Sequence, residues 1–216
     1  FLDINAPKNF KLVDHSFILK QNNISRCINL NLYKQTKILY TQIFYYNYSL
    51  KINPLMLSKL GNYKKVLVLD CDNTLWKGII GEDKENEILY NNKTDDGKYY
   101  FAIQNYAKQL ARQGVLLCIC SKNNHSDVIK FLSKDDMILD EKDFTVLKIN
   151  WNNKAENMYE ISKILNLSLD SFIFVDDSDF EIDYINKILP EILTLKVPKD
   201  LSDYNKRFKD LFFYFD

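Results

Sequence analysis

The sequence predicts an α/β protein built on a Rossmann-like parallel sheet with helices on both faces. From about residue 64 onward, short apolar runs alternate with longer segments of helical period. The apolar runs are continuous, as expected for strands that are covered on both faces. The chain has 216 residues, which is long enough to bury a core of this kind.

Strands and helices are expected to alternate over most of the chain after residue 63. The expected strands are residues 64–70, 115–120, 144–149, 171–175 and 192–195. The expected helices are residues 98–113, 125–134, 153–166 and 179–188, and Gly114 ends the first of them. Ligands of open parallel sheets bind at the carboxyl ends of the strands. Polar residues that follow these strands are therefore candidates for one shared pocket.

Residues 1–60 differ from the rest of the chain. They are polar and rich in asparagine, with one helix expected near residues 30–49, and Pro54 and Gly61 mark a boundary. We interpret residues 1–60 as an N-terminal helical arm or the remnant of an upstream domain. Residues 61–216 are expected to form the domain that holds the candidate site. The start at Phe1 and the aromatic end LFFYFD favour a fragment of a longer protein.

The composition narrows the possible partners and the compartment. Lysine and arginine together number 29, as do aspartate and glutamate, so the net charge is zero and neither nucleic acid nor an anionic membrane is expected as a partner. No apolar stretch approaches membrane-spanning length. The cysteines form no CxxC pair and no metal-ligand spacing, and they are Cys27, Cys71, Cys118 and Cys120. Reduced thiols of this kind favour a cytoplasmic protein.

Two aspartates follow the first expected strand. Asp70, Asp72 and Thr74 form the pattern D-x-D-x-T directly after VLVL. At this spacing, one carboxylate can attack the phosphorus of a phosphate monoester to give an aspartyl phosphate, and the other can handle the proton of the leaving group. Aspartates after a strand also make turns and cap helices, so the pattern alone leaves a structural role open.

Polar residues also follow the second and third expected strands. Ser121, Lys122 and Asn123 follow the second strand, and Lys154 begins the helix after the third. A hydroxyl and an ammonium group at these places can bind phosphoryl oxygens. Taken singly, a serine here is usually a helix cap and a lysine is usually solvated.

Two adjacent acids, Asp176 and Asp177, follow the fourth expected strand. Their repulsion is costly unless they share a cation. A hard divalent ion that keeps several waters and substrate oxygens fits such a pair, so Mg²⁺ is the expected cofactor.

These four motifs, in this order, resemble those of the haloacid dehalogenase (HAD) superfamily: DCDNT, Ser121, Lys154 and Asp176-Asp177. The resemblance implies a HAD-like fold. Within that superfamily, dehalogenases lack the second aspartate of the first motif and P-type ATPases carry threonine there. Asp72 therefore favours phosphatase or phosphotransferase chemistry.

Longer segments are similar to the FkbH-like family, namely LVLDCDNTLWKGIIGED, LLCICSKNN, NWNNKAENM and FIFVDDSDFE. The family transfers a glyceryl unit from 1,3-bisphosphoglycerate to an acyl carrier protein and releases phosphate. The resemblance covers about residues 64–195 and implies a phosphorylated small-molecule substrate and an acyl carrier protein as partner, in polyketide or related biosynthesis. Cys71 and Lys77 depart from the family pattern, which has an aliphatic residue and a glycine there.

The resemblance also implies a role for each site residue. Asp70 would be the nucleophile, and Asp72 would be the general acid and base. Substrate contacts would come from Ser121, Lys122, Asn123 and Lys154. Magnesium would be held by Asp70, by Asp72 through its backbone carbonyl and by Asp176. Asp177 would belong to the metal site as well, more as a partner that orients water or Lys154 than as a direct ligand. Thr74 would support the loop.

The segment from Trp76 to Gly97 is too short for a large cap domain, so only a minimal cap over an open site is expected. An open site suits a tethered substrate better than a small metabolite that must be enclosed. Trp76 could cover the substrate or pack in the core, and Cys120 could hold an acyl group or be a buried, inert thiol. Two other functions remain open: a plain phosphatase acting on a phosphoprotein or small phosphate ester, and a non-catalytic docking module. The clustered acids argue against the docking module.

Overall fold

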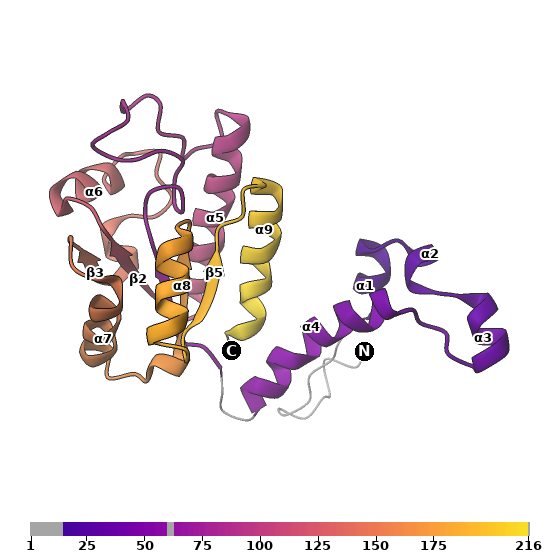
Figure 1. Ribbon diagram of the computed structural model, residues 1–216. Helices are drawn as coiled ribbons and strands as arrows, with labels where there is room; N and C mark the ends of the chain where they lie inside the picture. Colours follow the sequence, from indigo (N-terminus) through magenta and orange to yellow (C-terminus); the bar gives the residue numbers. More distant parts are fainter. Residues whose placement is uncertain (1–14, 60–62, 216) are drawn as a thin grey trace. The chain divides into compact units, whose positions relative to one another are not determined.

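The computed structural model describes residues 15–59 and 63–215. Contacts divide the chain into two compact units, Phe1–Leu60 and Gly61–Asp216. Each unit has apolar side chains packed in a core of its own. The second unit contains the sheet (Figure 1) and all of the candidate site residues.

The second unit is built on a five-stranded parallel sheet. Its strands are β1 (Val66–Leu69), β2 (Leu116–Ser121), β3 (Phe144–Ile149), β4 (Phe172–Asp176) and β5 (Leu193–Lys196). They are ordered β3-β2-β1-β4-β5, and each neighbouring pair is parallel. All residues of β1 and β4 are buried, as expected for central strands that are covered on both faces.

Helices cover both faces of this sheet. They are α5 (Asp95–Arg112), α6 (His125–Leu132), α7 (Lys154–Leu165), α8 (Asp179–Ile188) and α9 (Leu201–Asp210). Three short 3₁₀ helices are η1 (Glu141–Asp143), η2 (Leu169–Ser171) and η3 (Leu211–Tyr214). Leu67 and Leu69 of β1 pack with α5, α6 and α9, whereas Val66 and Val68 pack with α7 and α8. Because successive side chains of a strand point to opposite faces, these contacts place α5, α6 and α9 on one face of the sheet and α7 and α8 on the other. The predicted fold class is confirmed.

The order of the strands places a topological switch point at the end of β1. The chain passes from β1 to β2 on one side of it, and later returns to β4 on its other side. Such a reversal opens a crevice at the carboxyl ends of the strands, where open α/β sheets bind their ligands.

Two helices begin at this edge of the sheet because capping residues directly precede them. The side chain of Asn153 accepts a hydrogen bond from the backbone N–H of Ala155, and that of Ser178 accepts one from Glu181. These caps fix the first turns of α7 and α8, and thereby the backbone next to the site.

The strands of the sheet lie within two residues of their predicted bounds. Helix α5 begins at Asp95, three residues before the predicted start at residue 98. Helix α9 and the three 3₁₀ helices were not predicted. Helix α9 belongs to the fold because Tyr204 and Phe208 are fully buried in the core that it shares with α5.

The described part of the first unit corrects the prediction of one helix near residues 30–49. Its helices are α1 (His15–Gln21), α2 (Ile24–Cys27), α3 (Leu30–Thr36) and α4 (Gln42–Lys59). The predicted helix is wrong because Lys37 adopts the left-handed conformation, with φ of 64°, and ends α3. Helix α4 continues past Pro54, which therefore does not mark a boundary. Gly61 lies outside the described residues.

The described core of the first unit is small. Ile18, Cys27 and Phe44 are buried in it, and the ring of Tyr40 stacks on that of Phe44 with 3.9 Å between the centroids. The interpretation of this unit as an arm or as the remnant of an upstream domain stays a proposal.

The four cysteines are free and buried, as predicted for reduced thiols. Among the residues that the structure describes, no helix is both long enough and apolar enough to cross a membrane.

Candidate active site

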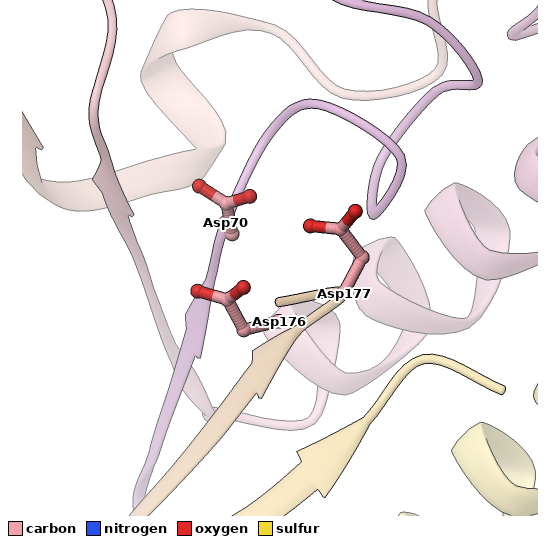
Figure 2. A group of neighbouring side chains, drawn as sticks. All are labelled: Asp70, Asp176 and Asp177. Atoms are coloured by element: carbon pink, nitrogen blue, oxygen red, sulfur yellow. The ribbon is translucent and has the colours of Figure 1, made fainter. Parts of the chain in front are cut away.

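Three carboxylates converge at the carboxyl ends of the two central strands (Figure 2). Asp70 directly follows β1, Asp176 ends β4, and Asp177 comes next in the chain. One oxygen from each carboxylate lies within 4.8 Å of the other two. Asp70 and Asp176 are buried and Asp177 is half-buried. Repulsion among three such groups is costly unless positive charge is close by.

Lys154 supplies part of that positive charge. It is the first residue of α7, and its side chain is only 4% exposed. Its ammonium lies 2.9 Å from Asp70 Oδ1 and 2.6 Å from Asp176 Oδ2. Burial alone would lower the pKa of this ammonium, but Asp70 and Asp176 raise the pKa above its usual range. Lys154 therefore stays charged and links the end of β1 to the end of β4.

The remaining negative charge fits a divalent cation. Three ionised carboxylates and one ammonium carry a net charge of −2. In the absence of a cation, burial and the neighbouring Asp70 raise the pKa of Asp176 to about 7, and the same two causes raise the pKa of Asp177. Carboxylate oxygens from two strand ends are the kind of donor that Mg²⁺ takes, together with water and substrate oxygens. Asp70, Asp176 and Asp177 therefore fit magnesium.

Three hydrogen-bond donors hold the carboxylate of Asp72, which is not one of the clustered groups among the described residues. Its Oδ1 accepts from Trp76 Nε1 at 2.8 Å and from the backbone N–H of Ile80 at 3.1 Å, and its Oδ2 accepts from Asn123 Nδ2 at 2.8 Å. Burial raises the pKa of Asp72, and these donors oppose the rise. A carboxyl group that is held in place with a raised pKa is suited to exchange a proton with a substrate.

The flap loop, residues 76–83, folds back on the first motif. Asn73 Oδ1 accepts from the backbone N–H of Gly78 at 3.0 Å, and Asp83 Oδ2 accepts from that of Ile79 at 2.7 Å. Gly78 has φ of 105°, in the region that favours glycine, and a Cβ there would meet Asp83 Oδ2 at 3.0 Å. The segment GIIGED, residues 78–83, is therefore held by contacts within this loop.

The structure brings two of the three predicted residues after the second strand to the site. Ser121 Oγ accepts from Asn123 Nδ2 at 3.3 Å, and the same amide reaches Asp72. This amide therefore joins the end of β2 to the end of β1. Lys122 points to α8, with its ammonium 2.6 Å from Glu181 Oε1. The substrate contact expected of Lys122 stays a prediction.

Cys71 and Cys120 lie beside the site but inside the core, and both are fully buried. Burial raises the pKa of Cys71 well above its usual range and raises the pKa of Cys120 to about 12. The thiolate is the nucleophilic form of cysteine. Neither thiol is therefore activated to hold an acyl group.

Sequence reasoning missed residues that position the site. Trp76, for which substrate contact and packing were both open, is fully buried, with its ring centroid 4.9 Å from that of Phe131. Its hydrogen bond to Asp72 was not foreseen, although its place four residues after Asp72 was a usable signal. The hydroxyl of Tyr204 donates to the carbonyl of Thr74 at 3.1 Å. The two residues are 130 positions apart in the sequence, so no local pattern predicts this contact. Thr74 is fully buried, and its hydroxyl has no hydrogen-bond partner among the described residues, so the loop support expected of it stays a prediction.

Comparison with known proteins identifies the fold. No protein-family model and no curated protein matches the chain. Among solved structures, the chain is similar to the N-terminal part of the protein BF1531 from Bacteroides fragilis, which contains a phosphatase domain and is complexed with Mg. The two share 28% identity with a TM-score of 0.86, over 92% of this chain. The chain has the haloacid dehalogenase fold. It spans 53% of the length of the Bacteroides structure.

Two other solved structures match the chain with lower scores. A protein from Vibrio cholerae, assigned as a 3-deoxy-D-manno-octulosonate 8-phosphate phosphatase, has a TM-score of 0.47 and 14% identity, covering 72% of this chain and 87% of its own. A protein from Legionella pneumophila, assigned to subfamily III A of the HAD hydrolases, has a TM-score of 0.43 and 16% identity, covering 77% and 96%.

Proposed function

We propose that this chain is a magnesium-dependent phosphoryl-transfer enzyme that forms an aspartyl phosphate. The observation that carries the proposal is the cluster of Asp70, Asp176 and Asp177, with Lys154 between two of its carboxylates. A module that served only for docking would gain nothing from buried acids that repel one another. The similarity to a phosphatase domain complexed with Mg in the Bacteroides protein supports the same chemistry.

The catalytic roles follow from position and charge. Asp70 attacks phosphorus, while Asp72 protonates the leaving oxygen and later takes a proton from the attacking water. Lys154 and Ser121 hold the phosphoryl oxygens, and the charge of Lys154 offsets the negative charge that spreads over them in the transition state. Asn123 orients Asp72 through its hydrogen bond.

The cation has a defined set of protein ligands in this proposal. Asp70, Asp176 and Asp177 hold it through their carboxylates, and Asp72 contributes its backbone carbonyl. When bound, magnesium lowers the repulsion between the Asp70 carboxylate and an incoming phosphate. Lys122 adds a further contact to substrate oxygens if its ammonium leaves Glu181.

For the substrate, we propose 1,3-bisphosphoglycerate, whose 3-phosphate ester gives its phosphoryl group to Asp70 while Asp72 protonates the leaving C3 oxygen. The thiol of an acyl carrier protein then attacks the C1 carbonyl, and the acyl phosphate leaves as inorganic phosphate, so that the carrier accepts the glyceryl group. The resemblance of the flap loop and of the four strand ends to the FkbH-like family supports this choice. Between β1 and α5 the chain forms turns and isolated bridges in place of a cap domain. A site without such a cap can admit the tethered arm of a carrier protein.

A plain phosphatase is the second candidate, and the cysteines favour it. Because the Cys71 and Cys120 thiols are buried with raised pKa values, this chain offers no activated thiol beside the site to hold an acyl group. Glyceryl transfer would therefore have to go directly to the thiol of the carrier. Simple hydrolysis of a phosphate ester or phosphoprotein requires no such acceptor.

Two measurements test the proposal, one for magnesium-dependent phosphoryl transfer and one for glyceryl transfer to a carrier. Hydrolysis of an aryl phosphate should stop in excess chelator and return with added magnesium, and activity that persists in the chelator would contradict the metal assignment. Mass spectrometry after incubation with 1,3-bisphosphoglycerate and carrier proteins should show a glyceryl adduct on a carrier. Phosphate release without any adduct would leave the plain phosphatase as the function.

A further inference from the structure

One large aromatic side chain is exposed next to the candidate site. Trp151 lies in the loop between β3 and α7, three residues before Lys154, and is 68% exposed. Its indole N–H donates to Asn124 Oδ1 at 3.3 Å. Asn124 directly follows Asn123, whose amide holds Asp72. The indole therefore lies at the carboxyl edge of the sheet, beside the residues that form the site.

Hydrogen bonds fix the loop that carries Trp151. The backbone N–H of Asn150 donates to the carbonyl of Ser121 at 3.1 Å. The side-chain amides of Asn150 and Asn157 bond to each other in both directions, at 3.2 and 2.9 Å, and Asn150 Oδ1 also accepts from the backbone N–H of Asn152 at 2.9 Å. Because Asn157 is almost fully buried, the loop is anchored to the interior and holds the indole at the surface.

Packing does not account for this tryptophan. Trp151 belongs to neither apolar core of the second unit as the structure describes it, whereas Trp76, the other tryptophan of the chain, is fully buried. Exposure of a large apolar ring to water is unfavourable, and a ligand that stacks on the ring removes this surface from water. A side chain that is already held in place also loses little conformational freedom when it binds a ligand.

We propose that Trp151 is a stacking platform for a planar group, either a ring or an amide plane, that lies beyond the phosphoryl group in the occupied site. In a plain phosphatase this group is part of the phosphate ester, and in glyceryl transfer it is an amide of the carrier protein's arm, since 1,3-bisphosphoglycerate itself carries neither. This inference rests on the proposed function, because that function fixes where the phosphoryl group lies. Lys154 and Ser121 hold that group at the strand ends, so the rest of the substrate extends outward past the edge of the sheet. The indole N–H is occupied by Asn124, which leaves the flat face of the ring for recognition. Trp151 thus determines specificity and takes no part in the chemical step.

The test uses the full chain with magnesium and three phosphonates, whose carbon–phosphorus bond is not a phosphate ester. Methylphosphonate has no planar group, phenylphosphonate has a ring, and N-acetyl-aminoethylphosphonate has an amide. We expect at least one planar ligand to bind the wild-type protein about two- to tenfold more tightly than methylphosphonate, measured as Kd by calorimetry. Trp151→Ala should abolish this preference, and Trp151→Phe should retain part of it. The ligand that gains affinity tells whether the natural group is a ring or an amide.

Two controls separate this effect from a general one. Tyr159→Ala removes another exposed aromatic, which is 46% exposed and lies further along α7, and it should leave all three Kd values unchanged. Trp76 is buried and bonded to Asp72, so it should respond alike to all three ligands. The difference in tryptophan fluorescence change between a planar ligand and methylphosphonate should therefore vanish in Trp151→Phe. Equal affinity of the wild-type protein for all three ligands, or a preference that survives Trp151→Ala, overturns this inference alone. Failure of all three to bind overturns the proposed phosphoryl site as well.

Discussion

The net charge of the metal-free site changes near neutral pH because of the protonation of Asp176. It is fully buried, and burial together with Asp70 raises its pKa to about 7 when no metal is bound. An unfolded chain titrates the same group near pH 4, at its ordinary pKa of about 3.9. Between these values the folded protein binds more protons than the unfolded chain. The stability is therefore present at the low end of this window and is lost as the pH rises through the folded pKa.

We expect the metal-free protein to unfold at a temperature about 4 °C lower near pH 8 than near pH 5.5. Saturating magnesium should remove or reverse this difference, because it binds and stabilises the ionised carboxylates. Asp176→Asn should weaken the dependence on pH. Thermal unfolding followed by circular dichroism, with and without chelator, measures all three. A metal-free protein that becomes more stable over this rise in pH would contradict the assigned charge balance.

Asp70 and Asp72 can be distinguished because only Asp70 belongs to the carboxylate cluster. Asp70→Asn should abolish phosphoenzyme formation and lower turnover at least about 10³-fold. Asp72→Asn should lower turnover about 10²-fold while magnesium affinity changes by no more than about twofold. Magnesium titration by calorimetry and labelling with radioactive phosphate give the two readouts. Labelled phosphate on Ser121 in place of Asp70 would show that the mechanism is wrong.

At the residue scale, the sequence predicted which side chains meet better than how they are held. Asp70, Ser121, Lys154 and Asp176 come together as expected, because a parallel sheet gathers the ends of its strands at one edge. The contact of Lys122 with Glu181 depends on how the loop after β2 approaches the first turn of α8, and no local pattern encodes that approach. The catalytic roles of these residues stay predictions.

At the scale of elements, the flap loop connects the second aspartate to the core. Trp76 packs against Phe131 and donates to Asp72 at 2.8 Å. Trp76→Phe keeps a ring in the core and removes the donor, so we expect turnover of an aryl phosphate to fall about tenfold and the free energy of unfolding to fall by about 1 kcal/mol. Magnesium affinity should stay unchanged.

A matched variant distinguishes the lost hydrogen bond from lost packing. Phe131→Leu disturbs the same contact without touching a donor to Asp72. It should lower stability in urea unfolding by about 1 kcal/mol and leave turnover near the wild-type value. Equal losses of turnover in Trp76→Phe and Phe131→Leu would show that the hydrogen bond to Asp72 does not matter.

Helix α5 joins two connecting segments, the one before α5 and the one after α6, through one buried amide. Gln104 Nε2 donates to the carbonyls of Leu75 and Tyr90 at 2.9 and 3.2 Å, and its Oε1 accepts from the backbone N–H of Ile138 at 3.1 Å. Gln104→Leu would leave these backbone groups unpaired, and we expect it to lower the free energy of unfolding by about 3 kcal/mol. Asn105→Ala, its exposed neighbour on α5, should cost less than about 0.5 kcal/mol in the same urea titration. Similar losses in both variants would contradict this role.

The sequence predicted the strands of this fold more accurately than its helices. Continuous apolar runs mark buried parallel strands, and each of the five runs expected to be a strand forms one in the sheet. Helix α9 was missed because its ten residues bury only Tyr204 and Phe208 among charged and polar neighbours. The helix near residues 30–49 was wrong because one left-handed residue, Lys37, interrupts it, and a lysine gives no turn signal.

At the scale of the whole molecule, the chain divides into two units, each with a core of its own, and the candidate site lies in the second unit. The described core of the first unit consists of Ile18, Cys27 and Phe44 with a few partly buried neighbours. The second unit has two larger cores, one on each face of the sheet. Every candidate site residue lies in the second unit. The two cores described for the second unit are therefore built from residues of that unit.

We expect a fragment of residues 61–216 to fold cooperatively by itself, because residues of that range form the sheet and the two cores described on its faces. It should bind magnesium with an affinity within about twofold of the full chain, since all the clustered carboxylates are retained. A fragment of residues 1–60 should be only marginally stable, because so small a core offsets little of the entropy lost on folding. Thermal unfolding and magnesium titration of both fragments measure this. A fragment of residues 61–216 that fails to fold, or folds without binding magnesium, would show that the first unit completes the second.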